Sequence, residues 1–262
     1  MDYKTALQCA RLSQDVYQEF SGIKFREWSG GDPVLVEFGP TDTQLAILED
    51  SSARLGTIIF RGSDKDKDWD INFSVDQTEY EWSREEKEEY REQMKEVAEA
   101  VTENEDLIYP DAYSKPSDPV KMHSGFARAY LSVRDRIHNH IKSSDATRYR
   151  VTGHSLGGAI ATLCAVDLQY NFSPKVAVEA YTFGSPRVGN SAFVDSYNRR
   201  VPDTWRVVNG WDAVVGLPVP WQGYRHVDAD IKMERGFTWR IITGSFEEHR
   251  ISNYIKALQS RV

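Results

Sequence analysis

The chain has 262 residues, of which 40% are hydrophobic and 12% aromatic, so it can bury a full core and is most simply one domain over residues 1–262. Its 32 basic and 40 acidic residues give a formal net charge of −8 at pH 7. Nucleic-acid binding needs clustered Lys and Arg, so this balance argues against nucleic acid as a partner and predicts that any transient contact with a lipid interface is apolar.

The first residues interleave charged and apolar side chains, without the apolar run that a signal peptide or a membrane span requires. Two cysteines, Cys9 and Cys164, do not suggest a disulfide framework, which suits a reducing compartment. We therefore expect a cytoplasmic protein with no transmembrane segment, and leave non-classical release as the alternative.

Apolar side chains in the first twenty residues recur at three- and four-residue steps, which predicts an amphipathic helix without assigned chemistry. Three short β-like runs follow at residues 34–38, 44–48 and 55–60, separated by turn residues. The third run is continuously apolar, as expected for a central strand that is buried on both faces.

That third run ends in Phe60-Arg-Gly-Ser63, at the carboxyl end of a central strand, where open α/β sheets place their sites. Beyond it, Trp69, Ile71 and Phe73 lie among charged residues. This pattern fits a flexible flap with an apolar underside, and equally an ordinary surface turn with a packed tryptophan.

Acidic residues far outnumber basic ones between residues 81 and 106, and Ser83 with Glu86 forms a capping-box pattern. We predict one long exposed helix, within an insertion of about residues 77–119 that ends in a proline-rich loop. Such a charge run is usually a solvated face, and a partner-binding surface is the alternative.

The stretch from Tyr149 to Ala159 predicts a buried strand that runs into a helix through Ser155. Gly153 and Gly157 give the G-x-S-x-G spacing of a nucleophile elbow, whose sharp turn leaves no room for flanking side chains and directs the hydroxyl outward. A structural serine in a glycine-rich turn is the alternative. Further strands at 175–183, 204–209 and 237–243, alternating with helices, predict an α/β fold with a mostly parallel central sheet.

A serine hydroxyl needs a histidine to accept its proton and a carboxylate to orient that histidine. Downstream of Ser155, topology favours His249, which follows the last predicted strand, over His226 in an irregular segment. Asp212 follows the carboxyl end of a predicted strand, whereas Asp203 stands at its start, so Asp212 is the favoured acid.

The remaining histidines are expected to be structural. His154 should point away from the neighbouring hydroxyl and pack, and His138 and His140 should lie at the surface. No histidine shows a metal-ligand spacing, and no dinucleotide or Walker glycine pattern occurs, so we expect no metal and no cofactor.

An oxyanion hole needs two donors, and losing one costs roughly 3 kcal/mol of transition-state stabilisation. The backbone N–H of Leu156, the residue after the elbow serine, is one candidate. Ser63 is the other, through its backbone and its hydroxyl.

Together these blocks resemble the class 3 (fungal-type, Rhizomucor-like) lipases of the α/β-hydrolase fold. The resemblance implies Ser155 as nucleophile, Asp212 as orienting acid, His249 as base, and a lid after Ser63 that contains Trp69, Ile71 and Phe73. The chain departs from the family in its acidic insertion, its charged lid segment and the lack of a signal. The matching blocks are Phe60–Ser63 with Trp69, His123–Phe126, Gly153–Gly158, Thr182–Asn190, Asp212–Pro218, Tyr224 with His226, and His249.

We therefore expect a serine carboxylic-ester hydrolase, most simply a lipase or esterase that cleaves acylglycerols or similar lipid esters through an acyl-enzyme. Phospholipase A1 or feruloyl-esterase-like specificity is an alternative, because pocket shape sets the preference. A non-catalytic lipase-like binding protein, with the acidic helix as its partner surface, is the rival from another class.

Overall fold

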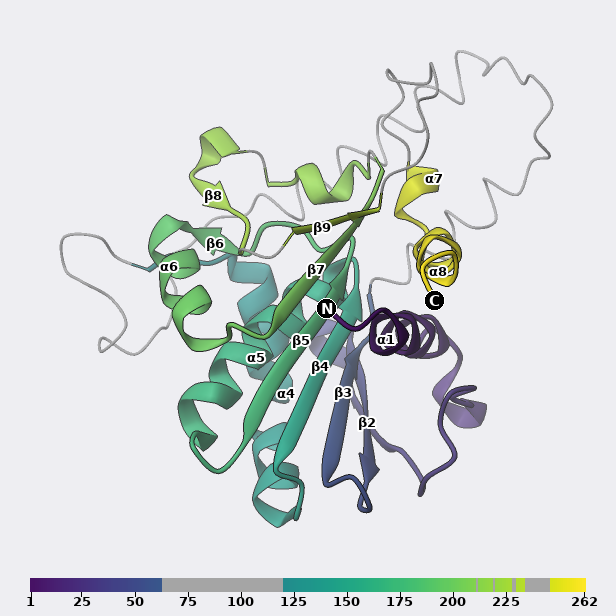
Figure 1. Cartoon of the computed structure of the whole chain (residues 1–262). Helices are drawn as coiled ribbons and strands as arrows, with labels where there is room; N and C mark the ends of the chain where they lie inside the picture. Colours follow the sequence, from purple (N-terminus) through teal and green to yellow (C-terminus); the bar gives the residue numbers. More distant parts are fainter. Residues whose placement is uncertain (63–119, 211, 219, 228–229, 234–245) are drawn as a thin grey trace.

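The computed structural model describes residues 1–62, 120–210, 212–218, 220–227, 230–233 and 246–262 (Figure 1). Several predicted features lie outside these residues and are not described: Ser63, Trp69, Ile71, Phe73, the insertion at about 77–119, and the strand at 237–243.

A mixed sheet of seven strands forms the centre of the described part, in the order β1-β2-β3-β4-β5-β7-β9. The first three strands are antiparallel, and β3 to β9 run parallel to their neighbours, so the sheet is mostly parallel as predicted. The strands are β1 (Val34–Phe38), β2 (Thr43–Asp50), β3 (Leu55–Phe60), β4 (Arg148–His154), β5 (Ala177–Phe183), β7 (Thr204–Asn209) and β9 (Asp230–Met233).

The sheet register brings the carboxyl ends of three central strands side by side. Phe60 at the end of β3 lies opposite Gly153 of β4, and His154 lies opposite Phe183 at the end of β5. The loops that leave these strands therefore start at one edge, the edge where parallel sheets collect functional residues.

Helices cover both faces of the sheet (Figure 1). One face carries α4 (Ser124–Ser143), α5 (Leu156–Phe172) and α6 (Ser191–Arg200). The other carries α1 (Tyr3–Asp15) and α8 (Ile251–Gln259), which pack against each other, with the short α7 (Phe246–His249) before α8. Because α5 packs on β4, β5 and α4, almost every side of it is buried.

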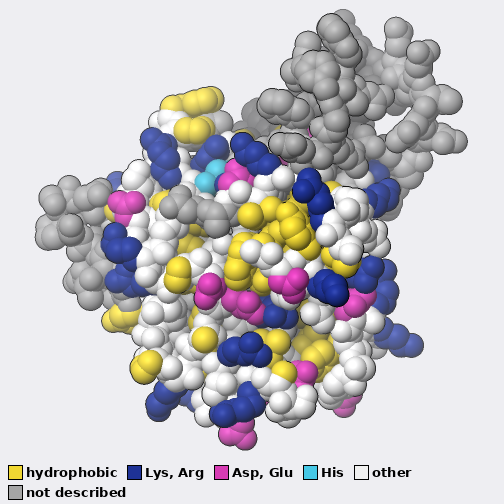
Figure 2. Space-filling model, viewed as in Figure 1, with side chains coloured by type: hydrophobic (Ala, Val, Ile, Leu, Met, Phe, Trp, Pro, Cys, Tyr) yellow, Lys and Arg dark blue, Asp and Glu magenta, His cyan; other side chains and the backbone are white. Residues whose placement is uncertain are grey.

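The surface seen in Figure 2 shows the face that carries α1 and α8. Basic and acidic side chains are interspersed there, and hydrophobic side chains gather where α1, α8 and β7 meet. Among the described helices, none is long and apolar enough to cross a membrane.

The remaining elements are short. A second sheet pairs β6 (Gly189–Asn190) with β8 (Tyr224–Arg225) in antiparallel fashion. The 3-10 turns are η1 (Phe20–Gly22), η2 (Gly39–Thr41), η4 (Val214–Gly216) and η5 (Pro220–Gln222).

Two local predictions were wrong. The N-terminal helix ends at Asp15 rather than near residue 20, and there the Asp15 carboxylate accepts the N–H of Arg26 (2.8 Å) from the chain as it turns back. His138 is buried rather than at the surface, because its ring bonds the Asp167 carboxylate between α4 and α5 (2.5 Å).

Candidate active site

Ser155 forms a strained turn between β4 and α5. Its backbone has φ 58° and ψ −129°, in the left-handed half of conformational space that side chains disfavour. A Cβ on Gly153 would come within 2.4 Å of the Gly157 carbonyl carbon, and a Cβ on Gly157 within 2.4 Å of the Phe60 oxygen. Both flanking positions therefore require glycine, which is the steric reason for the elbow spacing.

The structure brings Ser155, His249 and Asp212 into one hydrogen-bonded chain. The His249 Nε2 lies 2.7 Å from Ser155 Oγ, and its Nδ1 lies 2.8 Å from Asp212 Oδ2. All three residues are buried. A carboxylate only accepts, so Nδ1 carries the proton and Nε2 is left to accept from the serine hydroxyl. This is the arrangement in which a histidine can remove a serine proton.

Asp212 stays ionised in this buried position. Burial raises its pKa, but the charge of His249 and the hydrogen bonds from His249 and Tyr254 outweigh burial, and the net pKa is lowered. Its other oxygen, Oδ1, accepts the N–H of Val214 at 2.9 Å. The Tyr254 hydroxyl, from α8, donates to the same Oδ2 as His249. No sequence motif marks Tyr254, because its partner lies on a distant loop.

Gly184 lies against the Asp212 carboxylate and the His249 ring. A Cβ there would stand 2.7 Å from Asp212 Oδ2 and 2.9 Å from His249 Nδ1, and its φ is +59°. Glycine at the end of β5 therefore leaves the space in which these two groups meet.

The two less favoured candidates, His226 and Asp203, are not part of the hydrogen-bonded chain of Ser155, His249 and Asp212. His226 bonds the Val215 carbonyl through Nε2 (2.8 Å), and its pKa is lowered to about 3 by burial and by the charges of Arg206 and Arg187. Asp203 is exposed just before β7, at the opposite end of that strand from Asp212.

Of the two predicted oxyanion donors, the structure describes Leu156 but not Ser63. Leu156 is the first residue of α5, where a backbone N–H has no acceptor within the helix and where the helix dipole is positive. Ser63 and the predicted lid lie outside the described residues. The chain leading to Ser63 passes the elbow, because a Cβ on Gly62 would stand 3.0 Å from the His154 carbonyl oxygen.

Metal chemistry was not expected from the sequence. Within the described ranges, no group of three His, Cys, Asp or Glu side chains is placed to hold a metal ion.

Comparison with protein families gives a match to the family described as Lipase (class 3) over residues 57–221, more than half of the 262 residues. The matched range includes the elbow and Asp212 and ends before His249.

Among curated proteins, a secreted mono- and diacylglycerol lipase of Fusarium solani is 37% identical over 119 residues, covering 44% of this chain and 35% of that protein. The secreted mono- and diacylglycerol lipase LIP4 of Malassezia restricta is 31% identical over 159 residues, covering 57% of this chain and 52% of that protein. The chain thus spans about half or less of the length of these relatives.

Among solved structures, the Rhizomucor miehei triacylglyceride lipase superposes with a TM-score of 0.68 at 22% identity, covering 94% of this chain and 92% of that one. Lipase II from Rhizopus niveus gives a TM-score of 0.65 at 20% identity, covering 89% and 81%. These likenesses establish the α/β-hydrolase fold.

The relatives contradict the expectation of a cytoplasmic protein, since they are named as secreted. Cys9 and Cys164 are both buried and free, and burial raises the pKa of both thiols, that of Cys9 to about 12. Thiols of this kind are inert, so they do not indicate a reducing compartment.

Proposed function

The chain belongs to the class 3 lipase family, and from this premise we propose that it is a serine carboxylic-ester hydrolase that cleaves acylglycerols or similar lipid esters. The observation that carries the proposal is the hydrogen-bonded chain from Ser155 Oγ through His249 to Asp212. An activated hydroxyl of this kind serves acyl transfer. It speaks against a non-catalytic binding protein, which would not need it.

In the proposed reaction, His249 Nε2 takes the proton of Ser155 while Oγ attacks the ester carbonyl. Asp212 holds the imidazole in the required tautomer and offsets the positive charge that the ring gains. The negative oxygen of the tetrahedral intermediate is stabilised by the N–H of Leu156 and, as the second donor, by Ser63.

Collapse of the intermediate breaks the bond to the alcohol, and His249 gives its proton to the leaving oxygen. Water then attacks the acyl-enzyme with His249 again as base, which releases the fatty acid and restores the serine. These reaction steps need no cofactor.

Mono- and diacylglycerols are the substrates to test first, because the relatives are named for them. From the same names we infer that the protein works outside the cell. The lid role of Trp69, Ile71 and Phe73, and their contact with a lipid interface, are part of the proposal and rest on the family resemblance alone.

Replacing Ser155 tests the proposal directly. The Ser155→Ala variant should lose turnover of p-nitrophenyl esters by at least about 10⁴-fold, since without the hydroxyl no acyl-enzyme forms. The thermal midpoint should stay close to that of the parent. A fluorophosphonate probe should label the parent at Ser155 and leave the variant unlabelled.

The matched control is Ser196→Ala, which removes another buried serine hydroxyl, on α6. It should keep full turnover. Equal turnover by the parent and the Ser155→Ala variant would end the assignment.

A further inference from the structure

The elbow histidine, His154, lies between the N-terminal segment and the proposed base. Its ring is buried, with Nδ1 3.0 Å from the Tyr17 hydroxyl and Nε2 2.6 Å from the main-chain carbonyl of His249. Its ring also lies beside the His249 ring, with centroids 4.5 Å apart and planes inclined by 34°. His154, which is next to Ser155 in sequence, thus contacts both the main-chain carbonyl and the ring of His249, the proposed base.

The chemistry of the partners fixes the direction of these hydrogen bonds. Burial, followed by the charge of His249, lowers the pKa of His154 to about 3, so the ring is neutral. A carbonyl only accepts, so Nε2 carries the ring proton. Nδ1 is then an acceptor, and the Tyr17 hydroxyl donates to it. Both hydrogen bonds are therefore donated in the same direction: Tyr17 donates to His154, and His154 donates to His249.

The carbonyl that His154 binds lies at the end of α7, a helix that is too short to be stable without outside contacts. His249 is the last residue of α7, a helix of four residues. Carbonyls in the last turn of a helix have no N–H partner within the helix, so they need donors from outside it. His154 supplies one donor, and Asn209 at the end of β7 supplies a second, to the carbonyl of Glu248 (2.9 Å). The sheet therefore anchors α7 at its last two residues.

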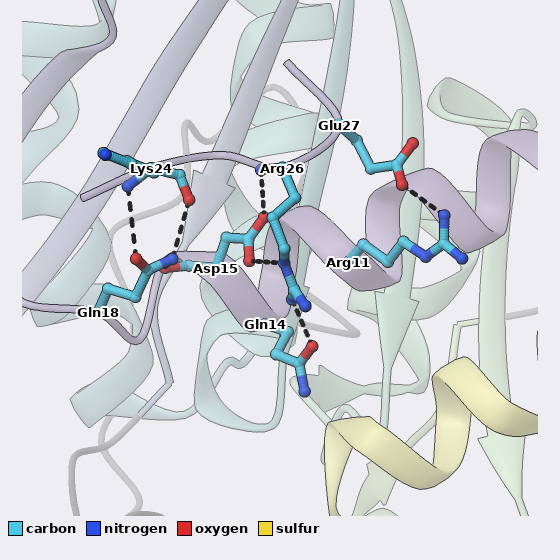
Figure 3. Close-up of polar contacts among 7 residues, drawn as sticks. All are labelled: Arg11, Gln14, Asp15, Gln18, Lys24, Arg26 and Glu27. Atoms are coloured by element: carbon cyan, nitrogen blue, oxygen red, sulfur yellow. Dashed lines mark hydrogen bonds and ion pairs between the residues drawn. The ribbon is translucent and has the colours of Figure 1, made fainter.

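The chain that flanks Tyr17 is held by a polar clamp, defined as Gln14, Asp15, Gln18, Lys24 and Arg26 (Figure 3). The Arg26 side chain bonds the buried Asp15 carboxylate through Nε (2.7 Å) and Gln14 Oε1 through Nη2 (2.6 Å). Gln18 Nε2 donates to the Lys24 carbonyl at 2.9 Å. The clamp ties the chain on both sides of Tyr17 into one loop.

We propose that Tyr17 and His154 are positioning residues for His249. Tyr17 fixes the His154 ring, and His154 fixes the main chain of His249, so that Nε2 of the base stays within reach of Ser155 Oγ. This inference rests on the proposed hydrolase function. It makes the N-terminal segment part of the support of the active site.

The decisive comparison is between two substitutions of His154. Methionine fills the space but donates no hydrogen bond, and we expect His154→Met to lower kcat by about 10- to 100-fold at nearly unchanged KM, because a displaced base loses its alignment. Glutamine can still donate to the His249 carbonyl, so His154→Gln should recover most of that loss. Tyr17→Phe, which removes one hydroxyl, should lower kcat by about 3- to 10-fold.

The matched control is Tyr197→Phe, which removes a buried hydroxyl that bonds Thr204 Oγ1 at 2.9 Å, away from the site. It should lower the thermal midpoint and leave kcat unchanged. If His154→Met and Tyr17→Phe behave like this control, with a lower midpoint and unaltered kcat, the positioning role is refuted.

If His154→Met does not fold, the kcat and KM values of Tyr17→Phe and His154→Gln decide whether the positioning role holds. If the parent hydrolyses none of the esters, the proposed function fails on its own. The rate at which a fluorophosphonate labels Ser155 in each variant then decides the positioning role separately.

Discussion

Asp212 is a buried charge whose neighbours all favour the ionised state. The N–H of Val214 points at one oxygen, and His249 with Tyr254 at the other. Hydrogen bonds to a charged group are worth about 1.5–3 kcal/mol each, so each donor matters to the titration of this carboxylate. Tyr254 is the donor that can be removed without changing His249, the proposed base.

Tyr254→Phe tests this contribution. The Tyr254 hydrogen bond lowers the pKa of Asp212, so its loss raises that pKa. As the pH falls, Asp212 then becomes protonated at a higher pH than in the parent. We expect kcat/KM at neutral pH to fall about 5- to 10-fold, because the carboxylate that orients His249 loses a donor. A kcat/KM equal to that of the parent would contradict this role.

Sequence and structure inform the site to different degrees. Ser155, Asp212 and His249 carry signals that sequence can read: a glycine-flanked turn, a position after a strand, and an order along the chain. Tyr254 and Tyr17 carry none, because their hydroxyls meet partners 42 and 137 residues away. Such contacts exist only once the helices have packed on the sheet.

At the scale of elements, α4 and α5 are joined by a polar cluster around Asp167. Its carboxylate accepts from Tyr130 (2.5 Å), His138 (2.5 Å) and Arg134 (3.1 Å), all from α4. Burial raises the pKa of Asp167, but the bonds from His138 and Tyr130 and the nearby cations outweigh it, and the net pKa is lowered. The ionised carboxylate therefore stabilises the contact between the two helices.

Asp167→Asn should lower the free energy of unfolding by about 2 kcal/mol at neutral pH, since three donors lose a charged acceptor. A carboxyl group with a lowered pKa contributes stability above its unfolded pKa and loses it as the pH falls through its folded pKa. The gap between parent and variant should therefore close below about pH 4, near the ordinary value for Asp. Urea unfolding at neutral and acid pH measures both quantities.

The control for this pair is Asp195→Asn, at an exposed position on α6. It should change the free energy of unfolding by less than about 0.5 kcal/mol at either pH. A gap for Asp167→Asn that persists unchanged in acid would show that its charge contributes nothing.

Strand prediction succeeded where side-chain pattern and burial agree. The bounds of β1, β3 and β7 are those that the apolar runs predict. By contrast, β9 was missed, because Asp-Ile-Lys-Met alternates over only four residues at the sheet edge. What makes it a strand is pairing with β7, a long-range contact that short sequences do not encode.

At the scale of the molecule, the first and last helices share one face and one apolar cluster. Tyr254, Ile255 and Leu258 of α8 pack with Ala6, Leu7 and Ala10 of α1 over β5 and β7. These two helices, which contain none of the matching motif blocks, thus cover the face of the sheet on which α7 and the proposed base lie.

Leu258→Ala tests how much this packing contributes to the whole fold. Leu258 is completely buried (0% exposed), so its truncation should lower the free energy of unfolding by about 3 kcal/mol. The reference is Leu131→Ala on α4, at 40% exposure, which should cost less than about 1 kcal/mol. Thermal or urea unfolding compares them, and equal losses would show that α8 is only loosely docked.

The order of the site along the chain has a consequence for biosynthesis. Ser155 and its turn are complete once β3, β4 and α5 have formed, whereas His249 and Tyr254 follow about ninety residues later. A nascent polypeptide on the ribosome therefore carries the serine without its proposed base while about ninety further residues are translated. Under the proposed function, reactivity toward esters begins only when α7 and α8 dock, so the catalyst is assembled and switched on in the same step.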